Sequence, residues 1–399
     1  MSNRLPESSH QSHSQSRKIK SNLKIAFIHN RYIGYRLPLF EKLAEFFDVR
    51  FFFDQIDSKT QIQKCYFSWT VLKSVQVLHS SLYDVTWSPM LPFHLLKGKY
   101  NFFVGGDVGH LGTYVAFIVA RLLRKPFVLC NEGWYYSGTL LRSLRQPFLN
   151  VMIQGSDAVV VPGTKAKEFF LRCGVDPKKI FVAPNASRLV INESTILQNE
   201  RLKEELGIEG KRIVLYFGRL MERKGVAILI KAFAKLQKKI EDAVLVIAGE
   251  GEERKKLENL CLELNVKNVL FVGYIDENSK SLYYSMADVF VLPSIAHSGE
   301  VWDLVLNEAM QLGKPLISTT AAGASCDLIK NGVNGYIVKE GDAEELSKAI
   351  EELLKNPERM RKMGLESKRI AENDFTFDRM AEGFVKAIRY AVNVGCGRD

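Results

Sequence analysis

Two basic side chains occupy a loop that joins a buried strand to a helix in the second half of the chain. The loop FGRLMERKG (217–225) follows the apolar strand at 212–218 and carries Arg219 and Lys224. Cations beside a helix N-terminus suit a diphosphate, because charge, dipole and unsatisfied N–H groups all favour the anion. Solvated surface charge is the alternative, and we favour it for Arg223. For Arg219 and Lys224, the position at a strand exit favours an anion site.

Two glutamates lie eight residues apart across the start of a later helix. Glu300 precedes the helix expected at 303–312, and Glu308 lies about one and a half turns inside it. A carboxylate accepts paired hydrogen bonds from vicinal hydroxyls, which is how proteins hold ribose and pyranose rings. Such a pair is common and usually forms a solvated face. This pair, however, follows a strand and a Pro-Ser loop in the same domain as the cationic loop. In that context the pair is a much more specific signal of a nucleotide-sugar site.

These loops need elements that hold them, and the first half of the chain alternates between strand and helix patterns. Strands are expected at 23–29, 49–54, 101–106, 126–130 and 157–163, and helices at 37–47, 112–124 and 139–153. Short connections between such elements favour a parallel sheet covered by helices on both faces.

The second half repeats the alternation. Strands are expected at 212–218, 243–249, 269–274, 288–293, 314–319 and 335–338, and helices at 225–239, 252–264, 279–286, 303–312, 343–355, 357–373 and 378–392. The pattern predicts an α/β protein with two doubly wound, Rossmann-like domains. Their expected bounds are a disordered polar tail at 1–20, a first domain at 21–185, a linker at 186–200, a second domain at 201–375 and a last helix at 376–392.

Composition narrows the class of protein. The 399 residues are 46% hydrophobic and 25% charged, values of an ordinary globular protein. No apolar run approaches the roughly 20 residues of a membrane span. Six scattered cysteines without a CxxC pair predict neither zinc nor a disulfide framework. The first 20 residues contain no apolar stretch, which predicts a cytoplasmic protein.

The two halves differ in charge. Residues 1–190 hold 25 Lys and Arg against 12 Asp and Glu, whereas residues 191–399 hold 30 against 33. A basic first half indicates a polyanionic partner: nucleic acid, an anionic membrane or a phosphorylated substrate. The alternative interpretation, a solvated surface that is simply rich in lysine, has weight comparable to that of a polyanionic partner.

The helix expected at 139–153 is the candidate for membrane contact. It combines Arg142 and Arg145 with apolar residues that include Phe148 and Leu149. That mixture suits an interfacial helix, and it equally suits a core helix with two exposed arginines.

The second half resembles the nucleotide-sugar domain of family 4 glycosyltransferases, retaining enzymes of the GT-B fold. Its GRL…KG loop is matched by Gly218, Arg219, Leu220, Lys224 and Gly225. The glutamate pair and the following NEAMQLGKPLIST also match, as do GEG at 249–251, VGYI at 272–275 and GVNGYIV at 332–338. The resemblance is strong over 200–392 and weaker over 23–190, and it implies two domains facing a cleft with the last helix crossing back to the first.

The resemblance also implies roles for individual residues. Arg219 and Lys224 would hold the donor diphosphate, Glu300 the transferred sugar and Glu308 the ribose. The backbone near Ile275 would meet the base, and Gly34 would face the phosphates from the first domain. The expected donor-binding set is completed by Gly218, Trp302, Asp303 and Leu304. The nucleotide sugar is a substrate in this scheme, with no further cofactor and no metal.

Two departures from the family pattern affect this scheme. The family usually has Pro-Phe-Gly or Pro-Trp-Gly after the first glutamate, whereas this chain has Val301, Trp302 and Asp303. Asp303 can cap the helix through its side chain, but it brings negative charge towards the donor phosphates. Many members have a histidine where this chain has Glu132. Glu132 would have a functional role, in which it binds the donor sugar or relays a proton, or it would be a structural acid. The functional and the structural interpretation both stay open.

The chain lacks the motifs that identify several other classes of protein. There is no Asp-x-Asp pair for a metal-dependent transferase, no GxGxxG opening a helix and no GxxxxGK[ST]. Together with these absences, the resemblance implies a metal-independent, retaining hexosyltransferase that moves sugar to a glycan or lipid-linked acceptor in cell-surface polysaccharide or glycoconjugate synthesis. It would work in the cytoplasm, with the inner face of the membrane as a candidate site and without a nucleic-acid partner. The alternative is a basic nucleic-acid- or membrane-binding protein on a GT-B-like scaffold without transferase activity.

Overall fold

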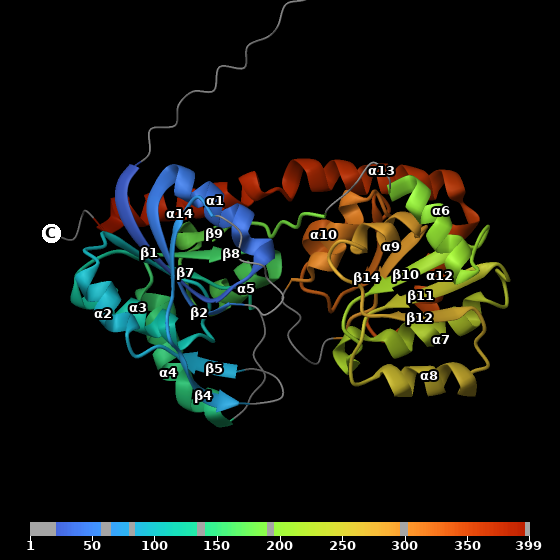
Figure 1. Cartoon of the computed structure of the whole chain (residues 1–399), viewed down its shortest axis with the longest axis horizontal. Helices are drawn as coiled ribbons and strands as arrows, with labels where there is room; N and C mark the ends of the chain where they lie inside the picture. Colours follow the sequence, from blue (N-terminus) through green and yellow to red (C-terminus); the bar gives the residue numbers. More distant parts are fainter. Residues whose placement is uncertain are drawn as a thin grey trace, which may run out of the picture.

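The chain folds into two α/β domains that lie side by side (Figure 1). The computed structural model describes residues 21–56, 65–79, 84–133, 140–189, 195–295 and 302–395. The expected tail at 1–20 and the expected site residue Glu300 lie outside these ranges. Two parallel sheets with helices on their faces confirm the expected fold class.

The first sheet has seven parallel strands in the order β3-β2-β1-β6-β7-β8-β9. Its strands are β1 (Ser21–Tyr32), β2 (Phe47–Ile56), β3 (Ser68–Val71), β6 (Phe102–Gly105), β7 (Phe127–Cys130), β8 (Ala158–Val161) and β9 (Ile180–Val182). Strands β4 (Val75–His79) and β5 (Asp84–Trp87) form a separate antiparallel pair. The strand order reverses between β1 and β6, and open parallel sheets bind ligands at such a point.

Helices cover both faces of the first sheet. One layer packs on a core that includes Phe103, Phe127 and Val159, and it consists of α2 (Leu91–Lys97), α3 (Leu111–Leu122), α4 (Leu140–Gly155) and α5 (Thr164–Arg172). On the opposite face, η1 (Gly34–Arg36) leads into α1 (Leu37–Phe46), which packs beside the last helix of the chain. The short turn η2 (Pro177–Lys179) precedes β9.

The helix expected at 139–153 is α4. Phe148 is 71% exposed on it, whereas Leu149 is buried at 5%. Side chains 140–145, which include Arg142 and Arg145, lie outside the described residues. Within the described part of the chain, every helix is too short or too polar to span a membrane.

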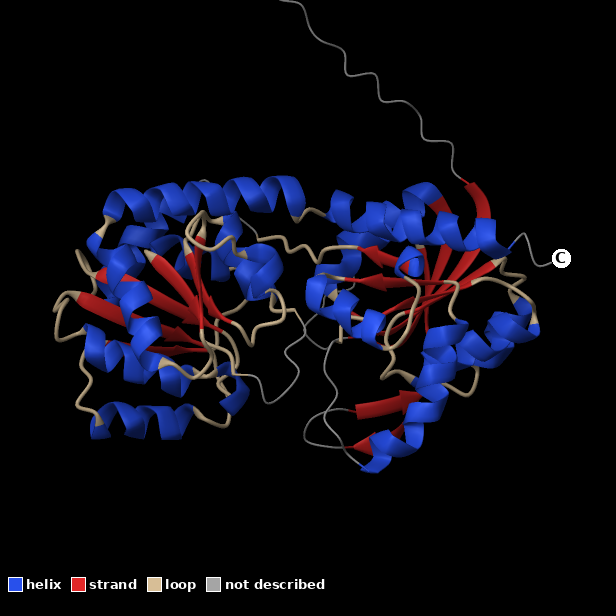
Figure 2. Ribbon diagram, turned by 180° about the vertical axis from the view of Figure 1, so that it is seen from behind, coloured by secondary structure: helices blue, strands red, loops and turns tan. Residues whose placement is uncertain are grey.

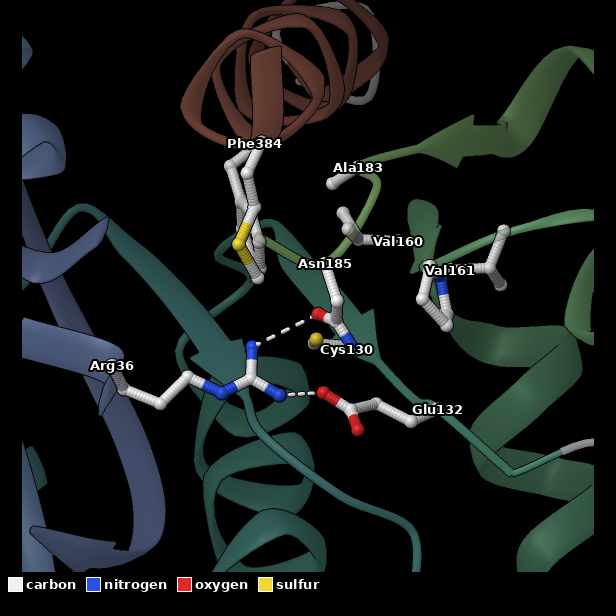
Figure 3. A pocket seen from close by; sticks show the side chains of 10 residues that line it. Arg36, Cys130, Glu132, Val160, Val161, Ala183, Asn185 and Phe384 are labelled. Atoms are coloured by element: carbon white, nitrogen blue, oxygen red, sulfur yellow. Dashed lines mark hydrogen bonds and ion pairs between the residues drawn. The ribbon is translucent and has the colours of Figure 1, made fainter. Parts of the chain in front are cut away.

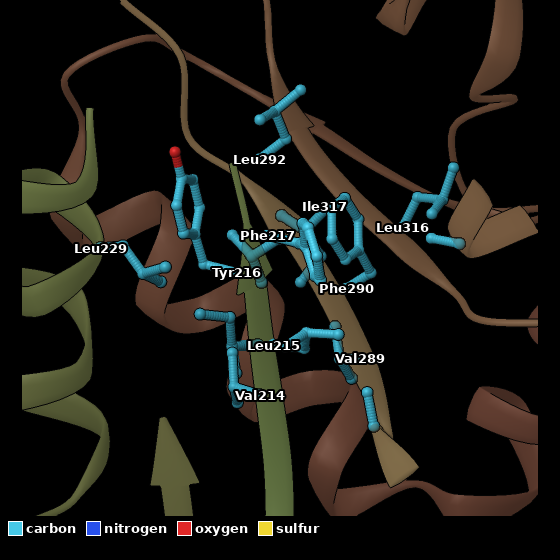
Figure 4. Close-up of a cluster of buried hydrophobic side chains, with 14 of the residues drawn as sticks. Val214, Leu215, Tyr216, Phe217, Leu229, Val289, Phe290, Leu292, Leu316 and Ile317 are labelled. Atoms are coloured by element: carbon cyan, nitrogen blue, oxygen red, sulfur yellow. The ribbon is translucent and has the colours of Figure 1, made fainter. Parts of the chain in front are cut away.

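The second sheet has six parallel strands in the order β12-β11-β10-β13-β14-β15. They are β10 (Arg212–Phe217), β11 (Ala243–Ala248), β12 (Val269–Gly273), β13 (Val289–Leu292), β14 (Leu316–Thr319) and β15 (Gly335–Val338). Fully buried runs such as 213–216 are expected for strands covered on both faces (Figure 4). The order reverses between β10 and β13, next to the expected cationic loop.

Figure 1 shows α7 and α8 on the side of the second sheet opposite α9 and α10. The elements are α6 (Thr195–Leu206), η3 (Glu222–Lys224), α7 (Val226–Leu236), α8 (Arg254–Glu263), α9 (Lys280–Met286), α10 (Leu304–Gln311), α11 (Ser325–Leu328), α12 (Ala343–Lys355) and α13 (Pro357–Asp374). Helix α6 begins inside the segment 186–200 that was expected to be a linker, and it packs on α9. The sequence of α6 is mostly polar, and this favoured the prediction of a linker.

The last helix, α14 (Phe377–Gly395), returns to the first domain as expected. It packs against α1 and against strands β7, β8 and β9. Gly383 lies so close to the carbonyl of Val182 that a Cβ atom would collide with the β9 backbone. Phe384 is buried beside Phe27 of β1, with the two rings 6.0 Å apart. The first domain therefore completes its core with the C-terminal end of the chain.

Replacing Phe384 with alanine is expected to lower the free energy of unfolding of the first domain by about 3–5 kcal/mol, because a cavity would open in its core. Arg389→Ala changes an exposed position of the same helix and should stay within about 0.5 kcal/mol of the wild type. Urea unfolding followed by circular dichroism measures both. Equal stability of the two variants would show that α14 is not part of the first domain's core.

Candidate active site

The carboxyl edges of the two sheets meet at the domain junction. Helix α5 starts just after β8, and the carboxylate of Asp327, beyond β14, accepts hydrogen bonds from the Thr164 amide at 3.0 Å and the Thr164 hydroxyl at 2.7 Å. Lys165 donates to the carbonyls of Thr320 and Ala322. The second domain thus caps a helix of the first.

Two further contacts cross the junction. The ring of Trp302 packs so close to Gly163 that a Cβ atom there would collide with it. The Trp302 indole N–H donates to Asn307 Oδ1, and Asn307 Nδ2 donates to the carbonyl of Asn185, both at 2.9 Å. Trp302, expected in the donor-binding set, therefore has its side chain buried in the junction.

Glycines shape the expected cationic loop after β10. Gly218 has a φ of 157°, and the Tyr216 hydroxyl donates to the carbonyl of Arg219 at 2.8 Å. The GEG segment after β11 passes directly against this loop. A Cβ atom on Gly249 or Gly251 would strike the carbonyl of Gly218 or Leu220, respectively. In the sequence, the GEG segment was only a match to the family. In the structure, its glycines allow a close backbone contact that fixes the loop.

Lys224 ends the turn η3 and is 7% exposed. The next residue, Gly225, adopts a left-handed conformation with a φ of 66°, and a side chain there would collide with the carbonyl of Pro293. The amide of Ile295 donates to the carbonyl of Arg223 at 2.9 Å. The loops after β10 and β13 are thereby pinned together. Arg219, in contrast, is exposed.

Asp303 forms an ion pair with Lys224, and both side chains are largely buried. This corrects one sequence expectation: Asp303 occupies the N-cap position of α10 but makes no side-chain cap hydrogen bond. Its carboxylate turns to the ammonium 79 residues earlier in the chain instead. The negative charge that departs from the family pattern is therefore neutralised by the expected phosphate-binding lysine.

Glu308 is buried in α10 and is held by α9. Its carboxylate accepts a hydrogen bond from the Tyr284 hydroxyl at 2.7 Å and one from the Lys280 ammonium at 3.1 Å. Burial raises the pKa of Glu308, and the opposing effects of Lys280 and Tyr284 do not cancel that shift. Oε1 accepts from Lys280 and Oε2 from Tyr284, so a ribose at Glu308 would share an oxygen that already has one partner.

The remaining expected donor-binding residues surround this region. Ile275 lies beyond β12 and is half-buried against the core of the second domain, as is Leu304 at the first position of α10. Gly34 opens η1 at the carboxyl end of β1. These positions follow the strand ends of both sheets.

In the first domain, Glu132 forms an ion pair with Arg36 (Figure 3). Arg36 is 8% exposed and also donates to Asn185 Oδ1 at 3.3 Å. Its buried Nε atom has no hydrogen-bond partner in the described residues. These three side chains line a pocket that Phe384 of α14 borders and whose remaining space of about 10 Å³ suits one water molecule. Arg36 was not among the residues predicted from the sequence, and its place two residues after Gly34 was the available signal.

Two histidines lie near this pair. Burial and the cation of Arg36 lower the pKa of His29 to about 3, so its ring is neutral at physiological pH. His110 is buried at the start of α3, with Nε2 2.8 Å from Asp54 Oδ2. The Thr86 hydroxyl donates to the same oxygen at 3.0 Å. The carboxyl edge of the first sheet is therefore polar and internally paired.

Two Rossmann-like domains that meet at their strand ends, with a last helix returning to the first, define the GT-B class of proteins. Solved structures share this fold. HepE from Anabaena, crystallised in complex with UDP, aligns with a TM-score of 0.74 at 19% identity, over 92% of this chain and 100% of its own.

The chain belongs to the group 1, family 4 glycosyltransferases. The family described as "Glycosyl transferases group 1" matches residues 198–369, and "Glycosyltransferase Family 4" matches residues 39–187. The alpha-D-kanosaminyltransferase of Streptomyces kanamyceticus is 32% identical over 268 residues, 64% of this chain and 68% of that protein. A GDP-mannose-dependent alpha-(1-6)-phosphatidylinositol monomannoside mannosyltransferase of Mycolicibacterium smegmatis is 29% identical over 170 residues, 41% of this chain and 44% of its own length. With several other curated relatives, the match spans about half of their length.

Replacing Glu308 with alanine is expected to destabilise the second domain by up to about 3 kcal/mol, because the Lys280 ammonium would lose its buried partner. It should also weaken binding of a nucleotide sugar by roughly ten- to hundred-fold. Glu277 pairs with the same lysine at 2.9 Å but is exposed, so Glu277→Ala is the matched control and should change neither quantity. Urea unfolding and calorimetry measure the two effects. A Glu308→Ala protein with wild-type donor affinity would exclude a ribose contact.

Proposed function

We propose that this protein transfers a sugar from a nucleotide-sugar donor to a hydroxyl of an acceptor. The observation that carries the proposal is the loop after β10, where close glycine contacts fix the backbone and Lys224 is held in place at the switch point of the second sheet. Family membership and the motifs at Arg219 and Glu308 support it. Glu300, outside the described residues, is proposed to bind the hydroxyls of the transferred sugar.

Charge on the leaving diphosphate would be neutralised by protein groups. Lys224 and Arg219 supply two cations, and the N-termini of α7 and α10 supply backbone N–H groups. Asp303 would hold the Lys224 ammonium until the donor phosphates replace that carboxylate as its partner. The chain contains no Asp-x-Asp pair, and this supports our proposal that transfer needs no metal.

Retention of the anomeric configuration is part of the proposal. If the leaving diphosphate assists the incoming hydroxyl on the same face of the sugar, no protein nucleophile opposite the anomeric carbon is required. Glu132 would act beside the reacting sugar from the first domain, with its carboxylate held at a fixed position by the ion pair with Arg36. This arrangement favours a positioning role for Glu132 over a proton relay.

The acceptor is proposed to be a glycan or a lipid-linked glycan in cell-surface polysaccharide or glycoconjugate synthesis. Support comes from the basic first half of the chain, which suits an acceptor carrying phosphate, and from the relative that is named for a phosphatidylinositol mannoside. The protein would then work in the cytoplasm at the inner face of the membrane.

Lys224→Ala is expected to lower turnover by two or more powers of ten, because one preorganised donor typically supplies about 2.7–4 kcal/mol of transition-state stabilisation. Lys231→Ala removes an exposed lysine of α7 and serves as the matched control, with unchanged turnover. Release of nucleoside diphosphate from a panel of nucleotide sugars measures both variants. Equal turnover of the two would remove Lys224 from the site.

Transfer is expected to continue in excess chelator and to give a product with the anomeric configuration of the donor. Turnover with and without EDTA tests the first part, and NMR of the product tests the second. Activity lost in the chelator and restored by magnesium would overturn metal independence. An inverted product would overturn retention, and donor binding without any transfer would favour the non-catalytic alternative.

A further inference from the structure

Helix α10, on the side of the second domain that faces the first (Figure 1), holds the segment after β9 through two amide side chains. Asn307 and Gln311 are four residues apart, which places them on one side of the helix. Asn307 Nδ2 donates to the carbonyl of Asn185 at 2.9 Å. Gln311 Nε2 donates to the carbonyl and the hydroxyl of Ser187, and Gln311 Oε1 accepts from the amide of Leu189 at 3.2 Å. This segment of the first domain is therefore attached to a helix of the second.

Asn307 is 1% exposed, and its two partners fix the orientation of its amide. The indole N–H of Trp302 can only donate, so it selects Oδ1, and the carbonyl of Asn185 can only accept, so it selects Nδ2. An aspartate at position 307 would keep the bond from Trp302 but would turn an oxygen towards the carbonyl of Asn185. The contact between α10 and Asn185 therefore requires the amide.

Asn185 extends this contact into the first domain. Its side chain is 4% exposed, and its Oδ1 accepts from Arg36 Nη1 at 3.3 Å (Figure 3). Another nitrogen of the same guanidinium, Nη2, pairs with Glu132. Within the described residues these are the two hydrogen-bonding partners of the Arg36 side chain, because its Nε atom is buried without one. The position of the guanidinium, and with it that of the Glu132 carboxylate, therefore depends on Asn185.

The other end of this arrangement lies among the residues proposed to hold the nucleotide. Asn307 directly precedes Glu308, and the same helix follows Asp303, which pairs with Lys224. A path of hydrogen bonds thus joins the helix that carries these groups to the acid of the first domain. We name the side chains of its four members the junction network: Asn307, Asn185, Arg36 and Glu132.

We propose that Asn307 and Asn185 are positioning residues for Glu132 and that they act through Arg36. The proposal rests on the proposed function, in which Glu132 acts beside the reacting sugar. The domain that is proposed to hold the nucleotide would thereby set where the other domain places its acid. Such positioning matters for the rate, because a displacement of about 1 Å at a reacting group can cost roughly a hundredfold.

The alternative is that the amides of α10 only hold the two domains together. Gln311 separates the two roles, because it binds the same segment through Ser187 and Leu189, whereas Arg36 is bound through the side chain of Asn185. Asn185→Ala keeps the carbonyl that Asn307 binds and removes the partner of Arg36. Gln311→Met keeps the size of the side chain and removes the attachment of the segment.

Release of nucleoside diphosphate from a panel that includes UDP-glucose and GDP-mannose tests the positioning role. Asn185→Ala should lower kcat by roughly tenfold and leave KM for the donor within about twofold, since the nucleotide-binding residues are untouched. In a Glu132→Gln background the same change should alter kcat by less than about twofold, because the acid that Asn185 positions is already altered. Gln311→Met is the matched control, with the kcat of the wild type. Additive losses in the double variant, or an equal loss of kcat in Gln311→Met, would overturn the proposal.

Urea unfolding tests the junction network without any turnover. The effect of Asn185→Ala on the unfolding constant should differ by at least about threefold between the wild-type and Glu132→Gln backgrounds, because both side chains contact Arg36. Additive effects would overturn the network, and coupled unfolding with an unchanged kcat would overturn the positioning role. Coupled unfolding in a protein that releases no nucleoside diphosphate would contradict the proposed function alone. Should Asn185→Ala not fold, Asn307→Asp replaces it and should show the same loss of kcat, again absent in the Glu132→Gln background.

Discussion

The contact between Gly163 and the second domain is the constraint on which the site depends. Only a residue without a side chain leaves room there for the Trp302 ring and the Asp327 carboxylate. Asp327 then caps α5 from the other domain, since Gly163 has no side chain with which to do so. Together with the hydrogen bonds that Lys165 and Asn307 donate across the junction, this close approach brings the carboxyl edges of both sheets together.

Buried ion pairs set the electrostatics on both sides of the junction. Lys224 pairs with Asp303, Arg36 with Glu132, and Lys280 with Glu308, and each pair joins separate elements. Such pairs contribute little net stability, because desolvation offsets most of the attraction. They do hold a charged group at a defined position before any ligand arrives. In the proposed function, a phosphate or hydroxyl of the donor would replace an existing partner and would not need to order a mobile side chain.

Local patterns in the sequence predicted all six strands of the second sheet, whereas β3, β9, α2 and α5 of the first domain were not predicted. Apolar runs of strand length gave the strands of the second sheet, and the loop at 217–225 was placed because its strand and helix are both unambiguous. Ion pairs between residues of distant elements could not be predicted in this way, because no local pattern in the sequence indicates them. Asp303 was expected to cap its own helix, since its preference for Lys224 depends on how the loops after β10 and β13 approach each other. Arg36 and Glu132 likewise meet only because η1, after β1, and the loop after β7 lie at the same edge of the first sheet.

The return of α14 to the first sheet determines the order in which the protein can mature. Residues 21–189 leave the ribosome well before α14, yet α14 covers part of one face of their sheet. Until then apolar side chains such as Phe27 and Val160 lack that cover, a condition that favours aggregation. Translation of the roughly 200 intervening residues takes about 10–40 s at ~5–20 residues per second. For that interval the sheet face that α14 will cover is open to contact with other chains.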